Sequence, residues 1–468
     1  MVETARVSLV HCGAREAIIG GTLCASANYN VELNVFGAWR NPMLYKLTEK
    51  SGGNYIRIDT AKKESVPEIV ERCAVSDFVF IGNETPVING LGNALRREYG
   101  EDVGVIAPNS EFALEKSKYG TRRIIDEVYP KANPEFYFIE PKKIGWERDA
   151  RKAVNALNGK VAIKPIEPKY GKGVIVEGFD FVAEEAYQKA IGTAKAGNFL
   201  IEEKIIGQEC SAQFDVDKNL HIGAFPYSRD FKRSEEKDKG PNTGGMAYFS
   251  DNKMNLPFMK RKEFKEGNKI ARKVLKKQSE ANGYEDGFLT GVFYPAYILT
   301  GKGIKVLEFN NRHGDPEALA LRTLENDAID VCLGMINGNL PRLKFKKQAV
   351  AGIYAAPLTY GEGKNRGNRW GRSPPTGSNI IKWNENDFSP NAKIYPGSIN
   401  LRDDGHMEIM KSRSVLVSSM APTLEEAFEN VNRDIRKIDG PVRHRTDANM
   451  EYVRMCEKEI IRLRRKFS

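Results

Sequence analysis

The sequence predicts a protein of the α/β and α+β classes that begins with a parallel sheet and contains about three domains. Its 468 residues exceed one ordinary core at roughly 150 residues per domain. With 41% hydrophobic and 29% charged residues, the composition is that of a soluble globular protein. In the first part, apolar runs alternate with segments of helical length, the pattern of a parallel sheet covered by helices.

The N-terminal domain is expected to span residues 1–107, with four strands at 7–10, 31–36, 78–81 and 103–106. Ligands of open parallel sheets bind beyond the carboxyl ends of the strands. Two segments follow such ends, namely Gly13-Ala-Arg15-Glu16 and Gly82-Asn-Glu84-Thr-Pro86. Gly13 would let backbone N–H groups approach a phosphate, and Arg15 would add a bidentate contact. The chain has neither Gly-x-Gly-x-x-Gly in this domain nor a P-loop, which excludes both nucleotide-binding motifs.

Positive charge exceeds negative charge, with 72 Lys and Arg against 62 Asp and Glu, for a net charge of +10. This balance favours anionic partners such as nucleotides or sugar phosphates, although a solvated lysine-rich surface explains it equally well. Residues 260–277 are predicted to form an amphipathic helix with a basic outer face. Because no basic patch is interleaved with aromatic residues, we expect no nucleic-acid partner.

The cysteines and the N-terminus indicate a cytoplasmic protein. The six cysteines are widely spaced, with no Cys-x-x-Cys pair and no histidine at zinc-ligand spacing, so we expect reduced thiols. The N-terminal apolar run is too short for a signal peptide or a membrane span, and no membrane partner is expected.

From residue 108 the pattern changes. Asn109 and Ser110 are predicted to cap a helix that carries Lys118. A strand at 161–165, a Gly-Lys-Gly loop and a second strand at 174–177 then predict a hairpin flap over phosphates, with charge from Lys164 and Lys172. The alternative is a surface hairpin with solvated lysines.

A further strand, at 199–203, ends in two acidic residues and is followed by Glu209. The backbone at such a strand end can contact an adenine edge while Glu209 accepts from ribose hydroxyls, although exposed glutamates are usually only solvated. Asp230-Phe-Lys-Arg233 and the glycine-rich segment 238–246 come next. Loops of this composition commonly enclose a ligand. A structural turn explains two of the glycines but explains less well why Lys239, Asn242 and Thr243 lie among them.

The segment 305–317 carries the clearest chemical pattern. Lys305 to Phe309 alternates as a half-buried strand does, so Glu308 and Asn310 should project from one face. A carboxylate and an amide oxygen at this spacing suit Mg2+, which takes few protein oxygens and leaves other positions to water and phosphates. Arg312 would neutralise charge on a transferring phosphoryl or acyl oxygen. The alternative is a solvating or capping role at a strand end.

Several motifs occur in the order and approximate spacing of the phosphoribosylamine–glycine ligase family, which the sequence resembles over nearly its whole length. They are Leu114-Glu-x-Ser-Lys118, Ala162-Ile-Lys164, Gly171-Lys-Gly-Val174, Ile201-Glu-Glu203, Lys239-Gly-Pro-Asn-Thr-Gly-Gly-Met246 and Glu308-Phe-Asn-x-Arg-x-Gly-Asp-Pro-Glu317. The tail, with Ser412–Val415, a Thr423-x-x-Glu426 capping box and Arg445–Asp447, resembles archaeal members in particular.

The resemblance implies an ATP-grasp enzyme of purine synthesis that uses ATP and Mg2+ (or Mn2+). Its substrates would be glycine and 5-phosphoribosylamine, joined through glycyl phosphate to give glycinamide ribonucleotide, ADP and phosphate. It also implies three units: an N-terminal domain (1–107), an ATP-grasp domain (108–343) with a lid at about 121–198, and a mixed C-terminal domain (344–468). We expect a monomer or a small homo-oligomer.

The resemblance also implies site residues. For catalysis these are Arg312, Asp315 and Lys239. For ATP they are Lys118, Lys164, Gly171, Lys172, Gly173, Glu202, Glu203 and Glu209. For the other substrates they are Gly13, Arg15, Glu16, Glu84, Asp230, Lys232, Arg233, Pro241, Asn242, Thr243, Gly244 and Gly245. Glu308 and Asn310 would hold the metal.

Two departures from the family pattern lie on the amine side. Ala17 stands where the family usually has the histidine of Gly-Gly-Arg-Glu-His, and Phe231 stands where it has that of Asp-His-Lys-Arg. These changes leave the identity of the amine open. One alternative is therefore an ATP-grasp ligase for another amine or acid. Another, of a different class, is a nucleotide-binding or nucleic-acid-binding protein without turnover.

Overall fold

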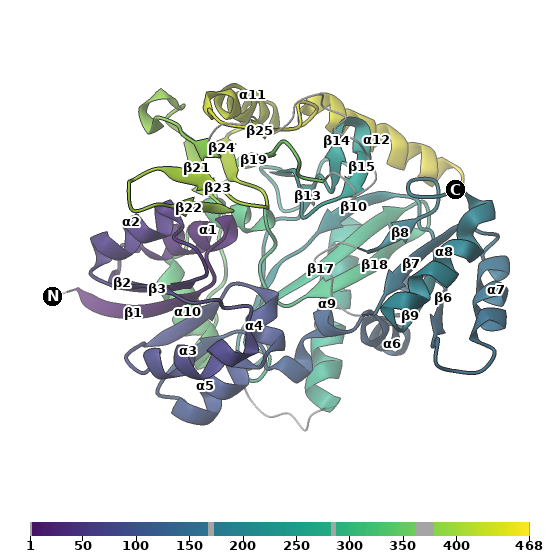
Figure 1. The fold of residues 1–468 in the computed structure, drawn as a ribbon, viewed down its shortest axis with the longest axis horizontal. Helices are drawn as coiled ribbons and strands as arrows, with labels where there is room; N and C mark the ends of the chain where they lie inside the picture. The colour runs from purple at the N-terminus through teal and green to yellow at the C-terminus, as the bar shows by residue number, and fades with distance from the viewer. Residues whose placement is uncertain (1, 167–172, 282–286, 362–378, 468) are drawn as a thin grey trace.

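The structure is a computed structural model that describes residues 2–166, 173–281, 287–361 and 379–467. Gly171 and Lys172, which we predicted to contact ATP, lie outside the described residues. In Figure 1 the N-terminal sheet lies on the left and a small four-stranded sheet on the right, with a long sheet between them. None of the described helices is long and apolar enough to cross a membrane.

The N-terminal domain is the predicted parallel sheet, with strand order β3-β2-β1-β4-β5. The four expected strands are confirmed, whereas β3 was not predicted because it has only three residues, all partly exposed. The order reverses between β1 and β4, so the carboxyl ends of these strands flank the switch point where such sheets bind ligands. The elements are β1 (Glu3–Val10), α1 (Ala14–Leu23), β2 (Tyr29–Gly37), α2 (Pro42–Ser51), β3 (Tyr55–Arg57), α3 (Val66–Arg72), β4 (Phe78–Ile81), α4 (Glu84–Ile88), α5 (Leu91–Tyr99) and β5 (Gly104–Ile106).

The largest sheet has eleven strands and runs from the central part of the chain into the C-terminal part. Its main path is β12-β11-β17-β10-β13-β16-β19-β24-β21, while β18 pairs with β17 and β25 with β19. The sheet is therefore continuous across residue 343, the domain boundary that we expect from sequence and that remains a prediction. Its strands are β10 (Gln208–Ser211), β11 (Phe214–Val216), β12 (Ile222–Ala224), β13 (Ser228–Asp230), β16 (Ala247–Ser250), β17 (Gly291–Thr300), β18 (Gly303–Asn310), β19 (Ala349–Pro357), β21 (Ala392–Pro396), β24 (Val415–Ala421) and β25 (Val442–Arg443).

The small sheet on the right of Figure 1 has the order β6-β9-β7-β8 and a core of its own. We call this unit the lid sheet. β7 and β8 pair antiparallel, as the predicted hairpin requires, and their connecting loop falls largely outside the described residues. The elements are β6 (Phe136–Ile139), α7 (Trp146–Ala156), β7 (Val161–Pro165), β8 (Ile175–Val176), α8 (Ala186–Thr193) and β9 (Phe199–Glu203).

The predicted start of the helix that carries Lys118 was wrong. Helix α6 (Lys118–Val128) begins after Ser117, whose hydroxyl accepts from the backbone N–H of Gly120. Two short 3-10 turns fill the interval after Asn109, whose side-chain oxygen accepts from Arg96 at 2.7 Å. The Asn109 side chain makes no capping hydrogen bond to the turn that follows it.

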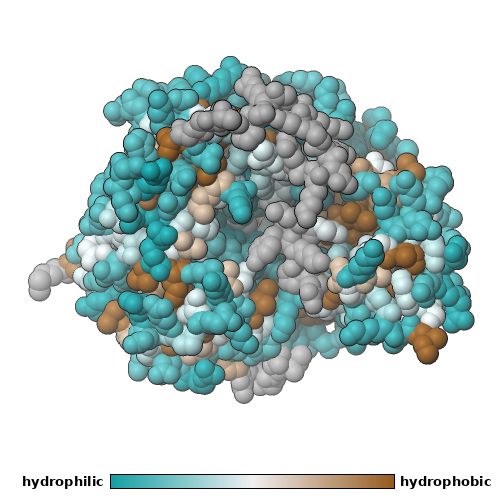
Figure 2. Space-filling model, viewed as in Figure 1, coloured by the Kyte–Doolittle hydropathy of each residue, from teal (hydrophilic) through white to brown (hydrophobic). Residues whose placement is uncertain are grey.

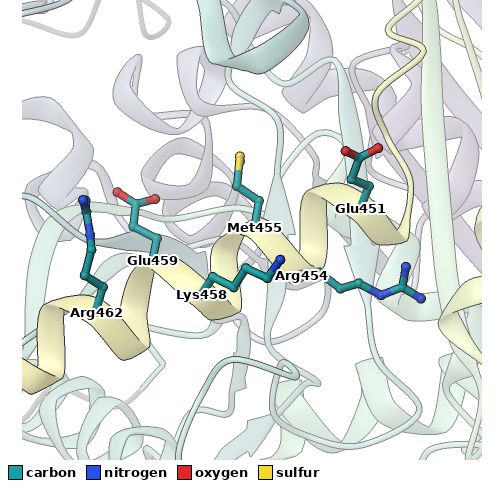
Figure 3. Close-up of a pocket in the computed structure, with 6 residues that line it drawn as sticks. All are labelled: Glu451, Arg454, Met455, Lys458, Glu459 and Arg462. Carbon is teal, nitrogen blue, oxygen red and sulfur yellow. The ribbon is translucent and has the colours of Figure 1, made fainter.

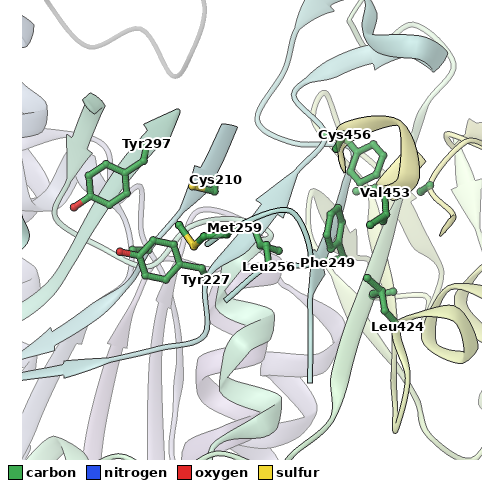
Figure 4. Close-up of a cluster of buried hydrophobic side chains, with 14 of the residues drawn as sticks. Cys210, Tyr227, Phe249, Leu256, Met259, Tyr297, Leu424, Val453 and Cys456 are labelled. Atoms are coloured by element: carbon green, nitrogen blue, oxygen red, sulfur yellow. The ribbon is translucent and has the colours of Figure 1, made fainter. Parts of the chain in front are cut away.

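The main hydrophobic core lies between the long sheet and helices packed against it (Figure 4). Tyr227 and Tyr297 stack at 6.2 Å, and Phe249, Leu424 and Val453 extend the cluster toward the C-terminal helices. Each fully buried side chain of this size contributes roughly 1.5–3 kcal/mol. The helices are α9 (Arg261–Ala281), α10 (Ala328–Asn337), α11 (Leu424–Asp434) and α12 (Met450–Arg465), and the remaining strands are β14 (Arg233–Glu235), β15 (Lys239–Asn242), β20 (Ile380–Ile381), β22 (Ile399–Leu401) and β23 (Met407–Ile409).

Helix α9 confirms the predicted amphipathic helix with its basic outer face. Ile270 and Val274 are fully buried, while most of its lysines and arginines are exposed. The face of the molecule in Figure 2 is mainly hydrophilic, with hydrophobic residues in small separate groups. All six cysteines are free thiols, as expected, and five of them are buried.

Candidate active site

Arg312 joins two distant parts of the chain at the edge of the N-terminal sheet. It follows β18. Its Nε donates to the Glu84 carboxylate at 3.1 Å, and its Nη2 donates to the Glu115 carboxylate at 2.8 Å. Glu84 begins α4 at the carboxyl end of β4, and Glu115 lies just before α6. Burial lowers the pKa of Arg312, but Glu115 and Glu84 raise it by more. The net shift is upward, so the guanidinium stays charged. Arg312 is thus held in place before any ligand binds.

The two carboxylates that share Arg312 titrate differently. Burial raises the pKa of Glu84, but Arg312 and Arg15 more than offset this and hold it at about 2. Burial raises the pKa of Glu115 to about 7, since Arg312 only partly opposes it and Glu84 adds to it. Glu84 therefore carries the negative charge at neutral pH, and Glu115 is the carboxyl that can hold a proton there. Glu115 belongs to a motif that we noted in the sequence, but we did not predict it as a site residue.

The loop after β1 is held by Glu16. Its carboxylate accepts from the backbone N–H of Gly13 at 2.7 Å and from Arg15 at 2.8 Å. Arg15 also donates to the carbonyl of His313 at 3.1 Å. Burial raises the pKa of Glu16, but Arg15 outweighs it, and the net shift is downward. Gly13 and Arg15, which we predicted to contact a phosphate, thus both donate to one buried carboxylate, and the Gly13 N–H is used in that contact.

On the other side of the site, Glu202 holds Lys164. The Glu202 carboxylate lies 2.7 Å from Lys164 and takes two hydrogen bonds from Arg122, at 2.8 and 3.0 Å. Burial raises its pKa, but Arg122 and Lys164 lower it to about 2, so Glu202 is ionised. Arg122 also donates to the carbonyls of Val306 and Leu307, and it thereby ties the lid sheet to β18.

Glu308 and Asn310 lie two residues apart on β18, after the register shift of that strand, so they share a face as predicted. Burial raises the pKa of Glu308, but Lys232, Lys118 and Lys164 together lower it, so the group is a carboxylate. Burial lowers the pKa of Lys118, and Glu308 opposes that shift. Three predicted lysines therefore lie near enough to one predicted metal ligand to influence its charge.

The oxygens of Glu308 and Asn310 fit a hard divalent cation. Within the described residues no group of three or more His, Cys, Asp or Glu side chains is placed to hold a metal ion. A pair of protein oxygens is what Mg2+ commonly takes when water and phosphates complete its shell, and it does not suit zinc. The donor set therefore fits a metal that arrives with a nucleotide.

Arg413 fastens the glycine-rich loop to Asp315. It precedes β24 and donates to the carbonyls of Gly244 at 2.7 Å and Gly245 at 2.8 Å, and to the Asp315 carboxylate at 2.9 Å. Gly245 has φ +107, and a Cβ there would lie 2.8 Å from Pro316, so the position requires glycine. Arg413 was not predicted as a site residue; the motif around Ser412–Val415 was the signal available.

The remaining predicted residues lie partly beside this loop and partly on the lid sheet unit. The Lys232 ammonium is 3.7 Å from the Glu209 carboxylate and 3.9 Å from the Asp230 carboxylate. Burial raises the pKa of Asp230 to about 7, although Lys232 acts to lower it. Arg233 donates to the carbonyl of Gly240. Thr243 is buried and bonded to the backbone, Pro241 and Asn242 are half-buried on β15, and Lys239, Glu203 and Gly173 are exposed.

Several known proteins are similar to this chain in sequence. The model of the phosphoribosylglycinamide synthetase ATP-grasp (A) domain matches residues 142–318. Phosphoribosylamine–glycine ligase of Methanosarcina barkeri is 31% identical over 451 residues, covering 94% of this chain and 95% of that protein. The Pyrococcus abyssi protein of the same name is 30% identical over 95% of this chain and 94% of its own. The chain belongs to the phosphoribosylamine–glycine ligase family.

Solved structures of similar fold agree with membership of this family. The crystal structure of phosphoribosylamine–glycine ligase from Thermotoga maritima matches with a TM-score of 0.71 at 21% identity, over 95% of this chain and 100% of that chain. The biotin carboxylase domain of Hydrogenobacter thermophilus 2-oxoglutarate carboxylase matches with a TM-score of 0.67 at 13% identity, over 97% of this chain and 93% of that chain. The ATP-grasp fold expected from the sequence is confirmed.

The two departures from the pattern of the ligase family are built into the core. Phe231 is fully buried, with its ring 4.2 Å from that of Tyr452 and the Arg445 guanidinium 4.9 Å above it. Ala17 is fully buried in α1. Hydrophobic packing thus occupies both positions.

A surface depression of about 600 Å3 lies along α12 (Figure 3). Its lining side chains all come from that helix: Glu451, Arg454, Met455, Lys458, Glu459 and Arg462. Binding sites are usually concave and combine apolar walls with convergent polar groups from several elements, so this depression is not the candidate site of the ligase.

Proposed function

We propose that this protein ligates glycine to 5-phosphoribosylamine with ATP, forming glycinamide ribonucleotide, ADP and phosphate through glycyl phosphate. The observation that supports this most is that buried carboxylates hold Lys164 and Arg312 in place, and that Lys118, Lys164 and Lys232 influence the charge of Glu308, in a chain of this family. Phosphoryl transfer depends on positioning and charge neutralisation more than on a protein nucleophile. The site supplies such charges.

On the nucleotide side, Lys118 and Lys164 would contact ATP phosphates. Glu202 is better described as a positioning residue than as a direct nucleoside ligand, because Lys164 and Arg122 already occupy its oxygens. Glu203 and Glu209 remain the proposed nucleoside contacts. Glu308 and Asn310 would hold Mg2+ or Mn2+, which when bound neutralises phosphate charge.

On the acyl side, Arg312 would stabilise the oxygens of the activated glycine, since Glu84 and Glu115 fix its position. Asp315 and the loop Lys239–Gly245 would enclose the acyl phosphate, held there by Arg413. On the amine side, the loop Gly13–Glu16 would bind the phosphoribosyl group. The three units 1–107, 108–343 and 344–468 then each contribute one wall.

The test is the complete reaction. ADP release from Mg-ATP should require both glycine and freshly generated phosphoribosylamine, and mass spectrometry should identify glycinamide ribonucleotide in equal amount to ADP. Omitting each substrate in turn is the control. Absence of ADP with all three substrates present, from a folded protein, would overturn the proposal.

A second candidate is a ligase of the same chemistry that takes another amine. The specific observation that favours it is the hydrophobic packing at Ala17 and Phe231. This candidate predicts that ADP appears with glycine and a different amine but not with phosphoribosylamine.

A further inference from the structure

His11 has a backbone conformation that glycine normally occupies. It follows β1 at the switch point of the N-terminal sheet, and its φ is +92. Residues other than glycine rarely adopt a positive φ. They persist there only where the surrounding structure offsets the strain, and they cluster at functional sites. The backbone N–H of His11 donates to the carbonyl of Phe36 at 2.9 Å, and this bond holds the backbone at His11 in place.

The imidazole of His11 is anchored through one nitrogen. Nδ1 lies 3.1 Å from the hydroxyl of Thr60, and the ring meets Trp39 edge-on at 5.6 Å. Thr60 is buried, and its contact with Nδ1 fits either ring tautomer; in the tautomer with the proton on Nε2, the Thr60 hydroxyl donates to Nδ1. Nε2 has no hydrogen bond to any residue that the structure describes, and the residue is half-buried. In that tautomer the ring has a donor that remains available.

The surroundings of His11 are those of the amine side. Gly13, Arg15 and Glu16 follow within five residues, and Glu84 begins α4 at the end of the neighbouring β4. Glu16, Arg15 and Glu84 are near enough to influence its charge, and burial lowers its pKa, so the ring is neutral at neutral pH. A neutral ring can donate from Nε2 without bringing a second positive charge beside Arg15.

We propose that His11 donates from Nε2 to the phosphoribosyl group of the amine substrate, replacing a polar contact that Ala17 and Phe231 do not supply. This inference rests on the proposed function, and it names a residue that determines amine affinity. It also gives a reason for histidine in a conformation that favours glycine.

Three variants separate this role from a structural one. His11→Gly removes the ring and relieves the strained φ. His11→Gln retains an amide donor near the position of Nε2, whereas His11→Asn retains only a group near Nδ1 that can contact Thr60. Asn158→Gly, at another described residue with positive φ, is the matched control.

We expect His11→Gly to raise the KM for phosphoribosylamine by about 10-fold, as loss of a hydrogen bond to a charged group predicts. The KM values for ATP and glycine should change by less than about 2-fold, and the unfolding midpoint should not fall. His11→Gln should recover part of the affinity, and His11→Asn should not. Recovery by His11→Asn alone would show that the Thr60 contact is structural and would overturn the inference.

A binding measurement separates failure of this inference from failure of the proposed function. Ribose 5-phosphate, followed by calorimetry, should bind the wild type and bind His11→Gly about 10-fold more weakly. Wild-type turnover with an unchanged amine KM and unchanged ribose 5-phosphate binding in His11→Gly would overturn the inference and leave the function intact. No wild-type turnover would overturn the function, and no wild-type binding of ribose 5-phosphate would overturn the inference.

Discussion

The proposed nucleotide side and the proposed amine side of the site differ in how closely they keep the family pattern. On the nucleotide side, Lys164, Glu308 and Asn310 match the motifs and lie together as those motifs require. On the amine side, Phe231 packs into the core and His11 occupies a conformation suited to glycine. Phosphate chemistry constrains charge and position strictly, whereas an amine can be recognised by different donors. The two departures from the family motifs, Ala17 and Phe231, are therefore on the side where the amine would bind.

The largest effect should come from the nucleotide side. Glu308→Gln removes one negative charge while nearly preserving shape, so turnover should fall by about 10²–10³-fold with little loss of stability. Steady-state ADP release and thermal unfolding would measure the two quantities. Glu147→Gln, at an exposed carboxylate on α7 of the lid sheet unit, is the control. An active Glu308→Gln variant with unchanged Mg2+ dependence would refute the metal assignment.

Arg312→Lys should combine a loss of turnover with a loss of stability. Lysine cannot reproduce the two contacts to Glu84 and Glu115, so the free energy of unfolding should fall by about 3 kcal/mol and turnover by about 10²-fold. Denaturant unfolding and ADP release would measure both. Arg148→Lys, at an exposed position in the lid sheet unit, should change neither. Full stability in Arg312→Lys would show that the site is not preorganised as described.

A smaller effect concerns pH and Glu202. Its pKa is about 2 in the folded protein, below the ordinary 4.5, so its stabilising effect is complete above pH 4.5 and is lost as pH falls toward 2. Glu202→Gln should lower the free energy of unfolding by roughly 3 kcal/mol at pH 7. The difference from wild type should shrink as pH drops below 4.5. A difference that stays constant between pH 7 and pH 3.5 would contradict this assignment of charge.

Local sequence patterns predicted the parts of the fold that depend on neighbouring residues. Apolar runs predicted β1, β2, β4 and β5 of the N-terminal sheet, and strand-like patterns predicted β7, β9 and β18. β3 was missed because its three residues are partly exposed and form no buried apolar run, and the start of α6 was misplaced because two 3-10 turns follow Asn109. Motif spacing predicted Glu308, Asn310 and Lys164 as site residues, and their roles remain predictions.

The residues that sequence reasoning missed act through distant partners. Arg413 contacts Asp315 across 98 positions, and Arg122 contacts Glu202 across 80. Neither pairing leaves a periodic trace in the local sequence, because the tertiary fold brings the partners together. The φ of His11 is likewise set by the sheet edge around it and not by its residue type.

The most direct test of the account is an amine competition. With Mg-ATP and glycine held constant, kcat/KM would be measured for phosphoribosylamine, for other phosphorylated amino sugars and for unphosphorylated amines. The account predicts the highest kcat/KM for phosphoribosylamine, with the same KM for ATP whichever amine is used. Preference for another amine, or no ADP release with phosphoribosylamine, would contradict it.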